Sequence, residues 1–159
     1  MPVWGKLARN TPKVSPGSIN NADQSARIRN LDLRYDKGVR TITFYGEVSS
    51  SHKPSSYSVM ISFKGVLEDD GLSDEEILQG YQPKPSLSRH EVLIRCSCPS
   101  YRFRFDKANR MNRAGTGARF PAYHRLTARK PNNPHNLPGF CKHALEFIEY
   151  LQRQGFIYA

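Results

Sequence analysis

The sequence lacks any apolar run long enough to cross a membrane, and its first residues, Met1–Lys6, lack the apolar core of a signal peptide. Acidic residues are scarce: 14 Asp and Glu stand against 24 Lys and Arg, a formal net charge of +10. Such an excess favours a polyanionic partner, either nucleic acid or an acidic protein face. Hydrophobic residues make up only 38% of the 159 residues, so we expect part of the chain to lie outside the core.

Cysteine is also scarce, and its placement is informative. The chain has three cysteines, so a disulfide would leave one of them over, and nothing indicates secretion. All three fall in two short sequences, Cys96-Ser97-Cys98 and Cys141-Lys142-His143. Three thiolates and one imidazole are a full ligand set for a closed tetrahedral zinc site. We expect an intracellular, reducing compartment, because metal binding requires reduced thiols.

Other interpretations of the same residues stay open. The cysteines could be small buried apolar residues, with His143 an ordinary surface side chain. A catalytic zinc is less expected, because it needs three protein ligands and a water. An iron–sulfur cluster held by three cysteines and one histidine is not separable from zinc by sequence.

The residues around the two pairs resemble a known family. Arg95-Cys96-Ser97-Cys98-Pro99 and Cys141-Lys142-His143-Ala144 are similar to the SWIM-type zinc finger, in which Cys-x-Cys, a variable gap and Cys-x-His precede an apolar helix. The resemblance covers Val92 to about Tyr150. It implies a ββα zinc module with metal ligands Cys96, Cys98, Cys141 and His143, and a role in binding DNA or other proteins.

The gap between the two pairs is longer than is usual in that family, with 42 residues between Cys98 and Cys141. A SWIM-like site with a long gap rich in arginine and proline also resembles virion structural proteins of tailed bacteriophages, in the neck, tail or baseplate. This second resemblance rests on the texture of the gap rather than on a motif.

The hydrophobic pattern predicts an α+β fold with a small antiparallel sheet, and the resemblance implies that a ββα-type metal module with a long basic insertion follows it. Residues 1–25 are rich in proline, glycine and polar residues, which predicts an extended N-terminal arm with Trp4 as its anchor. Residues 26–89 alternate in three stretches, 27–35, 39–48 and 57–64, which predict antiparallel strands. A capping box at Ser73 predicts a short helix ending by Gly80.

Residues 90–159 contain the metal-binding module. A strand at 90–95 delivers Cys96, and apolar residues at helical spacing predict a helix after Cys141 with Glu146, Glu149 and Arg153 facing outward. The apolar tail 156–158 would be either tucked against the sheet or offered to a neighbour.

The insertion 99–140 holds most of the charge. Nine Lys or Arg stand against one acid, Asp106, a net of +8, and aromatic residues lie among them. Alternation of Arg102, Phe103, Arg104 and Phe105 predicts a strand with both arginines on one face. The cations could contact phosphates, with rings stacking on bases, or pair with a protein partner. The candidate contact residues are Arg102, Arg104, Arg110, Arg113, Arg119, Arg125, Arg129 and Lys130.

An enzyme is not expected, because no carboxylate pair, no Ser/His/Asp set and no phosphate-cradling loop stands out. We expect a non-enzymatic, metal-stabilised structural or adaptor protein of a larger assembly, namely a tailed-phage virion. Its partners would be other subunits, and possibly DNA through the insertion, but neither a membrane nor a small-molecule substrate. It would lie in the host cytoplasm during assembly and then in the virion. The alternative is a SWIM-type, zinc-dependent nucleic-acid-binding module.

Overall fold

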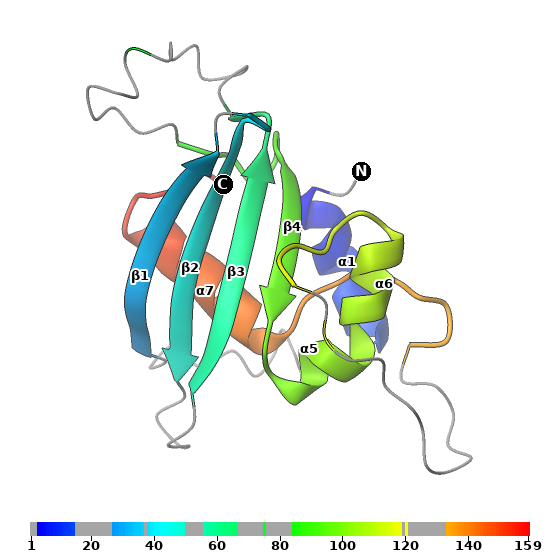
Figure 1. Ribbon diagram of the computed structural model, residues 1–159. Coiled ribbons are helices and arrows are strands. Elements are labelled where there is room, and N and C mark those ends of the chain that lie inside the picture. Colours follow the sequence, from blue (N-terminus) through cyan, green and yellow to red (C-terminus); the bar gives the residue numbers. More distant parts are fainter. Residues whose placement is uncertain are drawn as a thin grey trace.

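The computed structural model describes residues 3–14, 27–36, 38–49, 56–66, 75, 84–118, 120 and 133–159. They form the predicted α+β fold around a four-stranded antiparallel sheet in the order β1-β2-β3-β4 (Figure 1). The strands are β1 Arg27–Asp36, β2 Thr41–Ser49, β3 Ser56–Lys64 and β4 Glu91–Cys96. The helices are α1 Trp4–Val14, α5 Pro99–Arg104, α6 Asp106–Met111 and α7 Lys142–Arg153.

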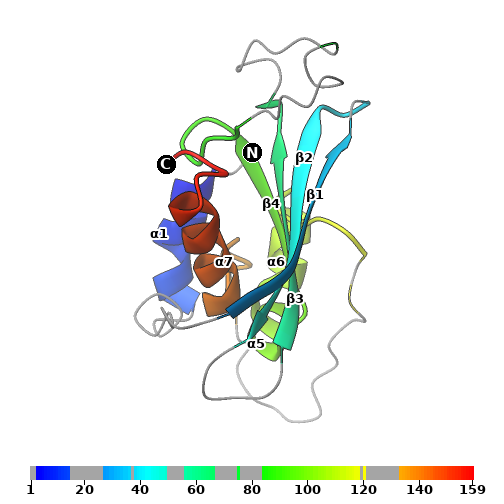
Figure 2. The same ribbon diagram turned by 90° about the vertical axis from the view of Figure 1, so that its left-hand side faces the viewer.

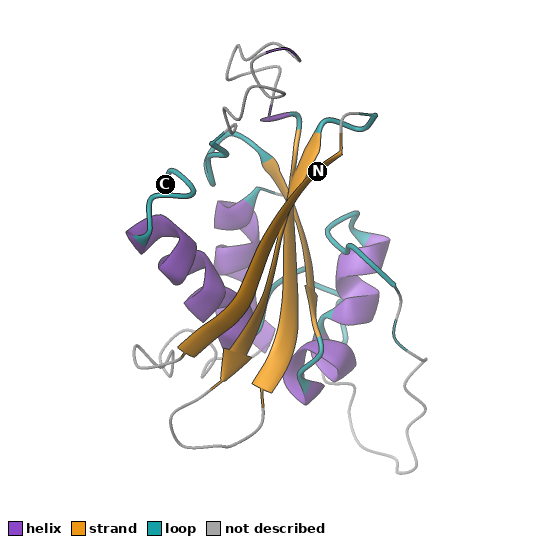
Figure 3. Cartoon of the chain, turned by 60° about the vertical axis from the view of Figure 1, so that its left-hand side comes forward, coloured by secondary structure: helices purple, strands orange, loops and turns teal. Residues whose placement is uncertain are grey.

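The helices lie on the two sides of the sheet. Figure 2 shows α1 and α7 together on one side, and Figure 3 shows the remaining helices, α5 and α6, on the other side of the strands. The chain after α6 joins the free edge of β4, where the Ile94 amide donates to the Ala114 carbonyl at 2.7 Å. None of the helices in the described part of the chain is long and apolar enough to span a bilayer.

The strand predictions are confirmed, because alternate apolar residues share the sheet face that α7 covers. Phe44 on β2 lies between Leu33 on β1 and Ile61 on β3, and both Phe44 and Ile61 are buried. The helix packs so close to β2 that a Cβ on Gly46 would lie 2.6 Å from Cε2 of Phe147. Buried residues from α1, from all of β2 to β4 and from α7 belong to one hydrophobic core.

The predicted extended arm is wrong for residues 4–14, which form α1. Trp4, Leu7 and Thr11 recur at helical spacing and are buried, a short apolar stripe that Gly5 and Pro12 obscured in the sequence. Trp4 is an anchor as expected: its ring stacks on Phe140 with centroids 4.1 Å apart.

The predicted strand at Arg102–Phe105 is also wrong, because α5 includes Arg102 to Arg104 and Phe105 is its C-cap. Pro99 stands in the first helical turn, where a missing amide costs nothing. Tyr101 and Phe105, four residues apart, are both fully buried, while Phe103 is 42% exposed. Helical spacing therefore places these two rings on one face and separates them from Phe103.

The predicted C-terminal helix is confirmed as α7, with one error in its faces. Glu149 and Arg153 are partly or fully exposed, but Glu146 is only 4% exposed, because α7 has the sheet on one side and α1 beside it (Figure 2). The apolar tail is tucked in, since Ile157 is buried and the Tyr158 amide donates to the Pro85 carbonyl at 2.8 Å. The helix expected from Ser73 lies outside the described residues apart from Glu75.

Candidate metal centre

The two cysteine-containing pairs meet in space, as their ligand types predicted. One ligand atom from each of Cys96, Cys98, Cys141 and His143 lies within 4.8 Å of the others. All four side chains are buried, and the three cysteines are free thiols. Ligands around one tetrahedral ion with bonds of about 2.3 Å lie about 3.8 Å apart, so a small contraction would close this cluster around a metal.

The end of β4 and the start of α5 place the first pair. Cys96 is the last residue of β4, opposite Val59 on β3. The chain then turns at Ser97, whose amide donates to the Ser58 carbonyl at 3.0 Å and whose Oγ accepts from the Ser58 amide at 2.9 Å. Cys98 caps α5, with its Sγ accepting from the Tyr101 amide at 3.4 Å. This bend brings both sulfurs of the pair to the same place.

The start of α7 places the second pair. Cys141 has extended backbone (φ −86°, ψ 170°) just before the helix, and its carbonyl accepts from the Leu145 amide at 3.2 Å. His143 stands in the first turn, its ring tilted against Tyr57 with centroids 4.8 Å apart. The sequence therefore predicted both positions correctly, with the cysteine before the helix and the histidine just inside it.

The electrostatic environment of the three thiols is compatible with a bound cation. Hydrogen bonds from the Cys141 and Cys96 thiols hold the pKa of Cys98 far below its usual value. Burial instead raises the pKa values of Cys96 and Cys141. One thiolate is therefore stabilised by two thiols, and ionising all three would crowd three buried negative charges together. A divalent cation would remove that cost and let all three act as ligands.

His143 provides a second indication that the residues fit a metal. Its Nδ1 is buried and has no hydrogen-bond partner among the described residues. A buried polar nitrogen of this kind is normally paired, since an unmade hydrogen bond is costly. With all four protein ligands on one ion, no open coordination position would remain for a water or substrate, so the arrangement suits a structural ion.

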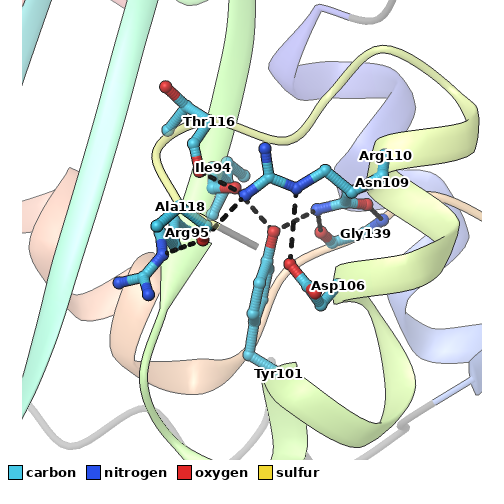
Figure 4. Close-up of polar contacts among 9 residues, drawn as sticks. All are labelled: Ile94, Arg95, Tyr101, Asp106, Asn109, Arg110, Thr116, Ala118 and Gly139. Atoms are coloured by element: carbon cyan, nitrogen blue, oxygen red, sulfur yellow. Dashed lines mark hydrogen bonds and ion pairs between the residues drawn. The ribbon is translucent and has the colours of Figure 1, made fainter. Parts of the chain in front are cut away.

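Sequence reasoning missed a buried polar network beside the cluster, shown in Figure 4. The Tyr101 hydroxyl donates to the Ile94 carbonyl at 2.6 Å, and Nδ2 of Asn109 donates to Tyr101 Oη at 3.1 Å. Asn109 also forms two hydrogen bonds with the backbone of Gly139, at 2.9 Å each. Asn109 lies in the polar stretch 106–110, and nothing in that pattern identifies its partners.

The predicted contact residues of the insertion do not form one surface. Arg110 points inward, with Nη2 donating to the Thr116 carbonyl at 2.7 Å and Nε 3.6 Å from Asp106 Oδ1. Arg102 and Arg113 are exposed, and Arg104 is half-buried. Arg119, Arg125, Arg129 and Lys130 lie outside the described residues.

No protein family, curated protein or solved structure matches this chain. The resemblance to the SWIM-type finger therefore rests on the four ligand residues and their order along the chain. The antiparallel pair β3–β4 followed by α7 gives these ligands a ββα setting, with α5 and α6 inserted between strand and helix.

Proposed function

We propose that this chain is a non-enzymatic structural or adaptor protein whose fold is completed by one zinc ion. The observation that carries the proposal is the buried cluster of Cys96, Cys98, Cys141 and His143. Structural zinc contributes about 10–16 kcal/mol of apparent binding free energy, which is as large as the whole stability of a typical domain of about 5–15 kcal/mol. A bound ion of this kind would contribute a large share of the stability of the folded chain.

The compactness of the cluster favours zinc over the iron–sulfur alternative. A cubane cluster holds each protein ligand on a different iron, so its ligands are spread more widely than those of a single ion. A spread of no more than 4.8 Å fits ligands that share one ion. The donor set of thiolates and one imidazole is also the set that zinc prefers.

A chelator titration tests the structural role. Stripping the metal at neutral pH should markedly lower the melting temperature of the full-length chain, and adding back Zn²⁺ should restore it. Emission from Trp4, the single tryptophan, reports the transition because its ring is stacked and buried. An unchanged melting curve after complete metal removal would contradict the proposal.

We further propose that the protein is part of a tailed-phage virion. This placement is supported by the resemblance of its long insertion, rich in arginine and proline, to virion structural proteins of tailed phages. In that setting the metal would fix the C-terminal half while surface segments bind neighbouring subunits. The protein should then sediment with large particles from its native source. Recovery only as a free monomer would contradict this placement.

A second candidate function is nucleic-acid binding, favoured by the exposed cations of the insertion. Arg102, Lys107 and Arg113 are exposed on or just after α5 and α6. The one acid in the insertion, Asp106, is buried beside Arg110. The guanidinium carbons of Arg95 and Arg102 lie 4.0 and 5.2 Å from the centre of the Phe120 ring, which adds a cationic aromatic surface.

Titration of labelled single-stranded and duplex DNA at several salt concentrations tests this candidate. Replacing Arg102, Lys107 and Arg113 with alanine should lower the salt slope by about one for each lost phosphate contact. The matched control replaces three cations on β1, Arg27, Arg29 and Arg34, which are exposed away from the insertion. Absence of salt-dependent binding would exclude nucleic acid as a partner of this surface.

A further inference from the structure

The network around Asn109 connects the two chain segments that carry the metal ligands. Ile94, which accepts from the Tyr101 hydroxyl, lies two residues before Cys96. Gly139, which Asn109 holds by two hydrogen bonds, lies two residues before Cys141. A single buried amide, linked to a single buried hydroxyl, therefore bridges the approaches to both cysteine pairs.

The same network also reaches the first pair from its other side. The Tyr101 amide donates to Sγ of Cys98, while the Tyr101 ring is fully buried and its hydroxyl faces Asn109. A movement of Asn109 would thus shift Tyr101, and through the Tyr101 amide it would displace Sγ of Cys98. Asn109 is itself 0% exposed, so no water competes for these hydrogen bonds.

The segment that delivers Cys141 is held from α1 as well. The Phe140 amide donates to Thr11 Oγ1 at 3.1 Å, and Trp4 stacks on the Phe140 ring. Gly139 fits against these groups so closely that a Cβ there would lie 2.6 Å from Cε1 of Phe105 and 2.8 Å from Thr11 Oγ1. Contacts outside the cluster therefore fix the backbone just before Cys141.

We infer that Asn109 and Tyr101 are positioning residues for the metal: they hold the two ligand pairs together before the ion binds and so raise its affinity without touching it. This inference rests on the proposed metal site. Partners of this kind outside the ligand shell typically change metal affinity by about 10–100-fold. Without this network, the ion itself would have to bring together two ligand pairs that lie far apart in the sequence.

Cobalt(II) binding to the full-length chain tests this inference, because Co²⁺ in a tetrahedral thiolate site absorbs visible light and can be titrated directly. Two variants disrupt the network with little change in volume. Asn109→Asp removes both Nδ2 hydrogen bonds and keeps the acceptor for the Gly139 amide. Tyr101→Phe removes only the hydroxyl and keeps the ring.

The matched control is Thr43→Val on β2, which loses a side-chain hydrogen bond of 2.8 Å to Ser62 but has no link to either ligand pair. We expect Asn109→Asp and Tyr101→Phe to bind Co²⁺ at least about tenfold more weakly, with altered visible bands. Thr43→Val should bind within about twofold of the unaltered chain, with the same bands.

The outcomes separate the inference from the proposed function. If the unaltered chain binds no Co²⁺, the metal site and the inference both fail. If it binds Co²⁺ and both network variants bind equally well with the same bands, the inference alone fails, and the network only supports the fold. Should Asn109→Asp not fold, Tyr101→Phe decides the matter by itself.

Discussion

Replacing Gly46 with alanine would drive a methyl group into the contact between the sheet and α7. The new Cβ would lie 2.6 and 3.0 Å from two ring carbons of Phe147, whereas ordinary carbon contacts are about 3.5–4.0 Å. The ring, and with it α7, would have to retreat by about 1 Å. Because α7 also carries His143, this retreat would disturb the metal site as well as the core.

The cost can be worked from these contacts. Overpacking of a tight core costs about 1–3 kcal/mol, and alanine in a strand recovers about 0.5–1 kcal/mol relative to glycine. The central values of these ranges leave a net loss of about 1.25 kcal/mol, which corresponds to a melting temperature lower by about 2.5–5 °C for a chain of this size. Thermal denaturation of the metal-loaded protein, followed by far-UV circular dichroism, measures this shift.

Gly5→Ala is the matched control, because it makes the same chemical change at an exposed position of α1. The nearest atom to a Cβ at Gly5 is Nη1 of Arg9 at 3.9 Å, an ordinary contact. Alanine should stabilise this helix by up to about 1 kcal/mol, so Tm should stay constant or rise. If Gly46→Ala melts at or above the unaltered chain, the packing described for α7 is wrong.

Three further outcomes are expected. Cys141→Ser should lose the metal and more than about 4 kcal/mol of stability, in one transition because the core is continuous; chelator sensitivity retained in this variant would contradict the ligand assignment. Trp4→Ala should cost about 3 kcal/mol, measured by urea denaturation, since its ring stacks on Phe140; a cost near zero would mean that α1 does not dock. Burial raises the pKa of Tyr101 above its unfolded value of 10.0, so the stability that the neutral phenol contributes is complete below pH 10 and is lost as the phenol of the unfolded chain ionises above it. In Tyr101→Phe, stability should therefore fall less steeply with rising pH above pH 10, by about 1.4 kcal/mol per pH unit. Equal slopes in the two proteins would contradict the burial of Tyr101.

The sequence predicted the elements whose pattern is local. Alternation identified β1, β2 and β3, and apolar residues at helical spacing identified α7. The ligand cluster was also predictable, although 42 residues separate its halves, because thiols and imidazole are rare enough in this chain to indicate one another. The metal-binding side chains identified these four residues as neighbours, although their positions in the sequence gave no such indication.

The errors came from positions that tertiary contacts decide. Gly5 and Pro12 indicated an extended chain, but docking of Trp4 and Leu7 against the core stabilises a helix. Alternating arginine and phenylalanine after Cys98 suggested a strand, but burial of Tyr101 and Phe105 on one side selects α5. The hydrogen bonds around Asn109 could not be predicted, because two of their acceptors are the main-chain carbonyls of Ile94 and Gly139. Every residue has such a carbonyl, so the sequence does not mark these two.

The metal content of the purified full-length chain tests the central claim most directly. Native mass spectrometry of protein prepared without added metal, compared with the same sample under denaturing conditions, gives the mass and number of bound ions. We predict one zinc ion per chain, absent from Cys141→Ser and retained in Thr43→Val. A chain that carries no metal while fully folded, or one that carries several iron and sulfide ions, would contradict this account.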